Sequence, residues 1–427
     1  MKLAFITARY GGEITRGPEY ACRLLAEHLA AARHSVDVIT TCARDATTWG
    51  NVYPEGTDRV RGVVVRRFTA IAAENHLETG RLAERFFAGV PSHPDEVEWI
   101  RRTGPWSPAM MNFLGRQHRQ YDALVFFSWR HVTTIQGLMV APKRSVLVPW
   151  LQDDPALRFG IAQATLASAA GVAYLSACEQ RIRQLHTRGA VAREEVVGIG
   201  VQPPPQMAYP RIQQDPNDEP EPENPDDERS ASQDEQYKPH LAVRGSLFRR
   251  RHRLDGRLVM YGGRIETRNG CEEMLEYFDS YATQAAADES LVMLGVKMMK
   301  VPEMASVRMA GVLPDRERLA AFEAADVTIA PSPDDLCAES VLESMAAGTP
   351  VLTNARNDAA VEHCRNSNAG LYYANRDEFV EAMRALMDDD ALRDSLGRNG
   401  LEYARQHFGW DAVLARFERL VTSIRPR

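Results

Sequence analysis

The chain has 427 residues, 44% hydrophobic and 26% charged, a composition typical of a globular protein with room for two or three domains. Its six cysteines form no Cys-x-x-Cys pair, which argues against a zinc site or a disulfide framework and favours a reducing compartment. No apolar run approaches the roughly 20 residues of a membrane span. No P-loop or nucleic-acid-binding motif appears. We therefore expect a cytoplasmic protein, and a peripheral position at the inner face of a membrane stays open.

The first 40 residues predict a strand, a glycine-containing loop, a helix and a second strand. Residues 3–7 and 36–40 are short, largely apolar runs typical of strands, and apolar residues at helical spacing follow Pro18. This order predicts parallel strands joined by a right-handed crossover. Further strands are expected at 63–68, 123–127, 145–148, 172–175 and 196–201, with helices between them. Residues 1–202 therefore predict a doubly wound sheet of the Rossmann type.

Residues 203–254 break this pattern. Ten acids and one arginine lie between Asp215 and Glu235, so this segment accounts for the whole acidic excess of a chain whose net charge is −7. Such a segment has too few apolar groups to offset the entropy of ordering, and it predicts a disordered insertion and linker. The basic run 249–253 follows. It is interpreted as a solvated flank of the linker, with a contact to acidic phospholipid or to the acidic segment as the alternative.

A second α/β domain is expected from residue 255 to residue 408. Its predicted strands begin near 257, 291, 307, 327, 351 and 370, and helices at 270–286, 315–325, 338–347, 376–388 and 390–407 separate or follow them. A last helix is predicted at 411–424. Two such domains predict a ligand site at the carboxyl ends of the strands.

The first stretch suited to chemistry is Gly-Gly-Arg-Ile-Glu-Thr-Arg-Asn-Gly at 262–270, directly after a predicted strand. Glycines such as Gly263 let the backbone approach a ligand. Arg264 and Arg268 offer planar donors suited to phosphate. Alone, this stretch is a weak indication, because Gly-Gly-Arg is common in turns.

The second stretch, 332–350, predicts a turn followed by a helix. The helix start near Cys337 and Ala338 is expected to present unpaired amides at the positive end of the helix dipole. Glu343 lies further along this helix, where it can reach a ribose diol. A solvent-facing acid is the ordinary interpretation of such a residue, but the presence of both stretches in this order favours a nucleotide site.

These stretches resemble the motifs of retaining glycosyltransferases of the GT-B fold, in sequence family 4 (group 1). Residues 331–352 resemble the Glu-x7-Glu region, residues 262–270 resemble a donor motif that usually ends in Lys-Gly, and residues 9–51 resemble the family's glycine-rich loop, helix and strand. Phe408–Trp410 resembles the start of a closing helix (409–427) that packs back on the N-terminal domain. The resemblance covers nearly the whole chain outside 203–250.

The resemblance implies two Rossmann-like domains facing each other across a cleft, with acceptor in the first and nucleotide-sugar in the second. It implies transfer of a hexose to a carbohydrate or lipid-linked acceptor with retention of configuration, without metal or cofactor. Implied catalytic residues are Arg264, Asp335 and Gln152. Implied donor-binding residues are Gly263, Arg264, Arg268, Asn269, Val312, Leu313, Cys337, Ala338, Glu339, Glu343, Arg16 and Gly17.

Four of these positions depart from the family pattern. Asn269 replaces the usual lysine, Asp335 replaces the first glutamate, Gln152 replaces a histidine, and Arg16 replaces the first of two loop glycines. Glutamine can hydrogen-bond a sugar but cannot change its charge. Two hypotheses therefore stand: an active glycosyltransferase with a variant site, and a degenerate relative that acts as a non-catalytic binding or scaffold subunit for an active one.

Overall fold

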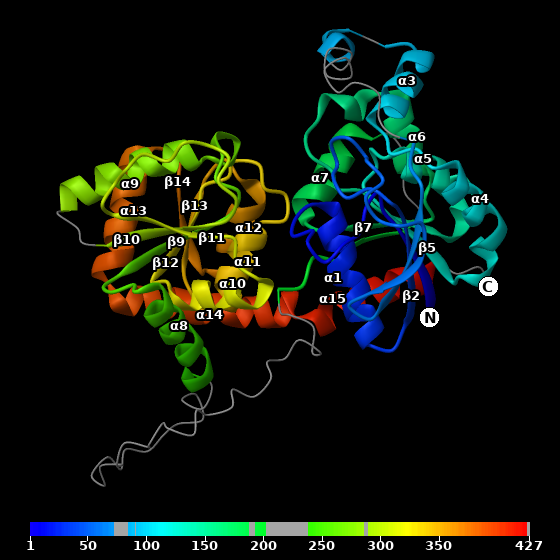
Figure 1. Ribbon diagram of the computed structural model, residues 1–427. Coiled ribbons are helices and arrows are strands. Elements are labelled where there is room, and N and C mark those ends of the chain that lie inside the picture. Colours follow the sequence, from blue (N-terminus) through cyan, green and yellow to red (C-terminus); the bar gives the residue numbers. More distant parts are fainter. Residues whose placement is uncertain (72–83, 90, 188–192, 202–237, 286–288, 425–427) are drawn as a thin grey trace. The chain divides into compact units, whose positions relative to one another are not determined.

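The computed structural model describes the chain except for residues 72–83, 90, 188–192, 202–237, 286–288 and 425–427 (Figure 1). It consists of two compact units, of which unit 1 contains Met1–Gly200 and Phe408–Arg427 and unit 2 contains Val201–His407. Two of the boundaries expected from the sequence, 202 and 408, lie close to these, whereas the second domain was expected to begin at 255 and unit 2 begins at Val201. Most of the acidic insertion expected at 203–254 lies outside the described residues.

Unit 1 is built on an eight-stranded sheet in the order β3-β4-β2-β1-β5-β6-β7-β8. Every pairing is parallel except that of β3 with β4. Its strands are β1 (Lys2–Ile6), β2 (Ser35–Thr41), β3 (Gly56–Val60), β4 (Val63–Phe68), β5 (Ala123–Phe127), β6 (Ser145–Val148), β7 (Gly171–Tyr174) and β8 (Glu194–Val196). Its helices are α1 (Pro18–Ala31), α3 (His93–Thr103), α4 (Pro108–Gln117), α5 (Val132–Leu138), α6 (Gly160–Ser168), α7 (Ala177–His186) and α15 (Trp410–Ser423).

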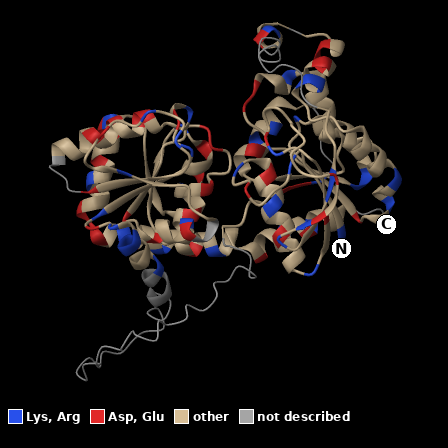
Figure 2. Cartoon of the chain, in the orientation of Figure 1, with Lys and Arg blue, Asp and Glu red and all other residues tan. Residues whose placement is uncertain are grey.

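Unit 2 is a six-stranded parallel sheet in the order β11-β10-β9-β12-β13-β14. Its strands are β9 (Leu258–Gly262), β10 (Ser290–Leu294), β11 (Val307–Gly311), β12 (Val327–Ala330), β13 (Val351–Asn354) and β14 (Gly370–Tyr373). Its helices are α8 (Lys238–His252), α9 (Cys271–Ala285), α10 (Asp315–Ala324), α11 (Glu339–Ala346), α12 (Asp358–Ser367), α13 (Arg376–Asp388) and α14 (Asp390–Phe408). Charged residues lie mainly on the helices around this sheet (Figure 2).

Side chains of β9 alternate between the two faces of the unit 2 sheet. Val259 and Tyr261 join one core with α9 and α13. Leu258 and Met260 join the other core with Phe248 of α8 and residues of α10. This alternation is the reason that a strand with an almost unbroken apolar sequence fits between two helical layers.

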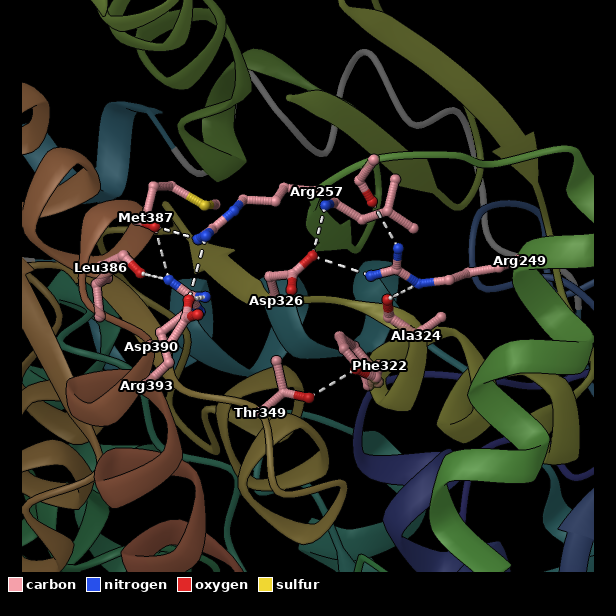
Figure 3. A network of polar contacts seen from close by, with 12 residues as sticks. Arg249, Arg257, Phe322, Ala324, Asp326, Thr349, Leu386, Met387, Asp390 and Arg393 are labelled. Atoms are coloured by element: carbon pink, nitrogen blue, oxygen red, sulfur yellow. Dashed lines mark hydrogen bonds and ion pairs between the residues drawn. The ribbon is translucent and has the colours of Figure 1, made fainter. Parts of the chain in front are cut away.

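The linker predicted at 203–254 is wrong for its last part, because residues 238–252 form helix α8. This helix packs against α10 of unit 2. Phe248 is buried in the α8–α10 core. Arg249 donates to the Ala324 carbonyl at 2.8 Å and pairs with Asp326 at 2.9 Å (Figure 3). The solvated-flank interpretation of 249–253 is therefore wrong for Arg249. The sequence hid this helix because its few apolar anchors lie next to a run of basic residues.

Asp326 and Asp390 anchor the amino-terminal ends of the unit 2 elements. Besides Arg249, the Asp326 carboxylate accepts the backbone N–H of Leu258, at the start of β9, at 2.7 Å. Arg257 reaches Asp390 and the carbonyl of Met387, so it joins β9 to α13 and α14 (Figure 3). These contacts lie at the amino ends of β9 and β12, and they leave the carboxyl ends of the same strands for a ligand.

Candidate nucleotide-sugar site

The two stretches singled out from the sequence meet at the switch point of the unit 2 sheet. The chain leaves β9 toward β10 and β11, then returns to β12 on the other side of β9, and ligands bind in such sheets where the strand order reverses. Gly270 has φ 74°, and a Cβ there would lie 2.4 Å from the Pro331 carbonyl oxygen. Arg268 Nη2 lies 3.7 Å from Asp334 Oδ2, a solvent-exposed pair of small energetic value. The loops after β9 and β12 are thus in direct contact.

The backbone of Arg264 is braced, whereas its side chain is about half exposed. The Arg264 carbonyl accepts from the Tyr261 hydroxyl at 2.7 Å and from Asn269 Nδ2 at 3.0 Å. A Cβ at Gly263 would lie 2.4 Å from the same tyrosine hydroxyl, so this position has no room for a side chain. Asn269, expected among the phosphate contacts, therefore has a structural contact with Arg264.

The amides of Cys337 and Ala338 were expected to be unpaired, but both are hydrogen-bonded to Asp335. Its Oδ1 accepts both backbone N–H groups, each at 3.2 Å. Ala338 is buried and has a left-handed backbone with φ 45° and ψ 43°, which is strained for a residue with a side chain. The carboxylate thus caps the turn before α11, and the helix itself begins at Glu339, which is half-buried.

Glu343 of α11 contacts Arg318 of α10. Arg318 Nη2 donates to Glu343 Oε1, and the two side chains are only 16% and 17% exposed. A guanidinium and a carboxylate at this depth are screened less than a surface pair. The acid expected to bind ribose is therefore held by Arg318, a basic residue outside the predicted site motifs.

Val312 and Leu313 follow β11, on the way to α10. Val312 is 62% exposed, whereas Leu313 packs against the α8–α10 core. Two further exposed apolar side chains, Val296 and Met298, follow the carboxyl end of β10. Exposed apolar side chains near Val312 are suited to contact with a flat ring, which agrees with its expected place among the donor-binding residues.

In unit 1, the predicted residues Arg16, Gly17 and Gln152 lie at the carboxyl side of β1 and β6. Gly17 has φ 83° and precedes α1 without a side-chain cap. Arg16 and Gln152 are both exposed. β1 and β6 both neighbour β5, and the strand order reverses between β1 and β5. These residues therefore follow strands next to the switch point of the unit 1 sheet.

Two residues with a positive backbone φ follow the strands next to this switch point. Ser128 and Trp150 follow β5 and β6, and both have left-handed backbones, with φ 66° and 55°. Backbone strain of this kind gathers at functional sites. His131 follows Ser128 along the chain. Its ring lies edge-on to that of Trp49, with the ring centroids 5.7 Å apart, and burial lowers the pKa of its imidazole.

Glu179 connects the loops after β6 and β7. Its carboxylate accepts the backbone N–H groups of Leu151 at 2.8 Å and Leu175 at 2.7 Å, next to the loop that carries Gln152. Burial raises the pKa of Glu179 to about 7, against hydrogen bonds from the backbone of Leu175, Leu151 and Trp150, which lower it.

Because this raised pKa favours the protonated form in the folded protein, Glu179 stabilises unit 1 most below pH 4.5, the ordinary pKa of a glutamate. This contribution falls as the pH rises from there to about 7, by about 3 kcal/mol in total. We expect Glu179→Gln to remove this pH dependence. Urea unfolding at pH 5 and pH 8, followed by tryptophan fluorescence, measures it, because all six tryptophans lie in unit 1. An equal pH dependence in both proteins would contradict the assignment.

Comparison with known proteins agrees with this geometry. Residues 246–403 match the family described as glycosyl transferases group 1. The matched residues all lie in unit 2. D-inositol 3-phosphate glycosyltransferases of Corynebacterium aurimucosum and Corynebacterium glutamicum are 28% and 30% identical to this chain over 115 and 109 residues. The matches span 27% and 25% of this chain and about a quarter of each relative, 27% and 26%.

Solved structures share the fold of the whole chain. Sucrose-phosphate synthase from Thermosynechococcus elongatus has a TM-score of 0.64 at 16% identity, covering 99% of this chain and 98% of its own. The Anabaena protein HepE, in complex with UDP and glucose, has a TM-score of 0.65 at 13% identity, covering 99% and 100%. The predicted GT-B fold, with two α/β units built on parallel sheets, is thereby confirmed, as is the group 1 glycosyltransferase resemblance.

Two further findings concern the described residues. None of their helices is long and apolar enough to cross a membrane. No group of three or more histidine, cysteine, aspartate or glutamate side chains within them is arranged to hold a metal ion.

Proposed function

We propose that this group 1 glycosyltransferase transfers a hexose from a nucleoside diphosphate sugar to a carbohydrate or lipid-linked acceptor, with retention of configuration and without metal or cofactor. The convergence of the 263–270 and 331–338 loops at the switch point of unit 2, with Arg264 half exposed on a braced backbone, supports this function most directly. The relatives named as inositol phosphate glycosyltransferases and the structural neighbour with bound UDP and glucose also support it.

In the proposed reaction, the bond from the anomeric carbon to the diphosphate oxygen breaks, the oxygen of the acceptor hydroxyl bonds to that carbon, and the hydroxyl proton passes to the departing diphosphate. Negative charge grows on the departing diphosphate. Arg264 donates to it there, and a guanidinium on a pre-organised backbone stabilises the transition state more than the ground state. Arg268 adds a second cation.

The acceptor is proposed to bind unit 1, near Gly17 and Gln152 at the switch point between β1 and β5. The proposed location is the cytoplasm, with a peripheral position at the inner face of a membrane if the acceptor is linked to lipid.

A second candidate is a non-catalytic subunit that supports an active, paralogous glycosyltransferase. It is favoured by the contacts that occupy three predicted ligand groups: Glu343 with Arg318, Asp335 with the turn amides, and Asn269 with Arg264. In this case, nucleotide binds without turnover.

Calorimetry with UDP and GDP, followed by assay of the hydrolysis of UDP- and GDP-sugars, separates the two candidates. The proposed function predicts nucleotide binding together with slow release of sugar to water in the absence of acceptor. Nucleotide binding without any hydrolysis or transfer would favour the subunit, and absence of binding would refute the transferase.

A further inference from the structure

The contact between Arg318 and Glu343 joins two helices that border the candidate nucleotide site. Arg318 lies in the second turn of α10, which follows the Val312–Leu313 segment, and Glu343 lies in α11, which follows the 331–338 loop. Both side chains are more than four-fifths buried, so the ion pair is part of the packed structure. Arg318 thereby connects the segment after β11 to the acid expected to bind ribose.

Arg318 is carried on a firmly anchored helix. Glu323 of α10 pairs with Arg244 of α8, and the Phe322 carbonyl accepts the hydroxyl of Thr349 at 2.7 Å. Arg251 of α8 adds a contact to Glu317 at 3.1 Å. A guanidinium held by such a helix has few conformations available, so it fixes the group that it contacts.

We propose that Arg318 is a positioning residue that makes the site selective for the ribose of the nucleotide, an inference that rests on the proposed function. Arg318 holds Oε1 of Glu343 and leaves Oε2 as the acceptor for one ribose hydroxyl. A carboxylate fixed in this way discriminates strongly against a nucleotide that lacks that hydroxyl, because the acceptor is then left without its partner.

The test compares UDP and GDP with their 2′-deoxy and 3′-deoxy forms by calorimetry. We expect the wild type to bind one of the two deoxy forms about tenfold or more weakly than the parent, and the other within a few fold. In Arg318→Ala this discrimination is expected to fall to within a few fold, and Arg318→Lys, which keeps a cation there, is expected to retain part of it.

Arg251→Ala is the matched control, since it removes an arginine contact to α10 without touching Glu343, and its discrimination should equal that of the wild type. Far-ultraviolet circular dichroism of each variant confirms the fold. If Arg318→Ala proves unfolded, the test uses Arg318→Lys, for which the affinity for the parent nucleotide is compared with that for its deoxy form.

Wild-type discrimination in both Arg318 variants, or tighter UDP or GDP binding in Arg318→Ala, would overturn the inference while leaving the proposed function intact. If the wild type binds none of these nucleotides, both the inference about Arg318 and the proposed function are overturned. The two failures therefore give different results.

Discussion

Arg264→Ala is expected to lower the turnover of the nucleotide-sugar about 10²–10³-fold, the usual effect of removing one donor from the site where charge develops. The side chain of Arg264 is about half exposed, and its backbone contacts come from Tyr261 and Asn269, which the substitution leaves in place. Stability should therefore change little. Initial rates of sugar release or transfer, with calorimetry for nucleotide affinity, measure the effect.

Arg384→Ala is a matched control for Arg264→Ala. Arg384 lies on α13 of the same unit and pairs only with Glu381 among the ion pairs described, on the surface of its own helix. The same charge is removed far along the chain from both site loops, so turnover is expected to stay at the wild-type value. Equal rates for wild type and Arg264→Ala would show that this arginine does not contact the leaving group.

Gly295→Ala is expected to destabilise unit 2 by about 3 kcal/mol or more and to impair nucleotide binding. Gly295 follows β10 with φ 130°, and a Cβ there would lie 1.8 Å from the Gly263 carbonyl oxygen. Relief of this overlap requires movement of the loop that carries Arg264. Urea unfolding followed by circular dichroism reports the loss, while tryptophan fluorescence, which reports unit 1, should stay unchanged.

Gly256→Ala is the control that separates the steric overlap of an added Cβ from the cost of a positive φ. Gly256 also has a positive φ, 71°, but an added Cβ there meets nothing within 4 Å. Its substitution is expected to cost about 1 kcal/mol, the ordinary penalty of a left-handed residue with a side chain. If Gly295→Ala cost no more than Gly256→Ala, the close approach to Gly263 would not be a constraint on the loop.

Strands with unbroken apolar sequence and helices with regular apolar spacing were predictable, because periodicity follows from burial on a given face. The strands at β9, β10, β12 and β13 lie within a residue or two of their predicted positions. β3 was missed because residues 56–60 are polar and nearly all exposed at the sheet edge, where no face needs an apolar side chain. The predicted strand 196–201 is wrong in position, since β8 spans 194–196.

For the nucleotide site, the sequence predicted which segments form it but not how their side chains are arranged. Motif spacing placed 262–270 and 332–350 after neighbouring strands, and the sheet order brings them together. The capping role of Asp335 and the brace from Asn269 were not evident, because a side chain that turns back to its own loop has the same sequence as one that faces a ligand.

The sequence by itself determined the two α/β units, the resemblance to group 1 glycosyltransferases and the two loops at the candidate site, since these depend on local periodicity and short motifs. Only the tertiary structure decided that α8 belongs to the core of unit 2 and that Arg318 holds Glu343. The physical reason is the same in both cases. Each contact joins residues on different helices, 25 positions apart for Arg318 and Glu343, and their meeting is set by packing against a shared sheet.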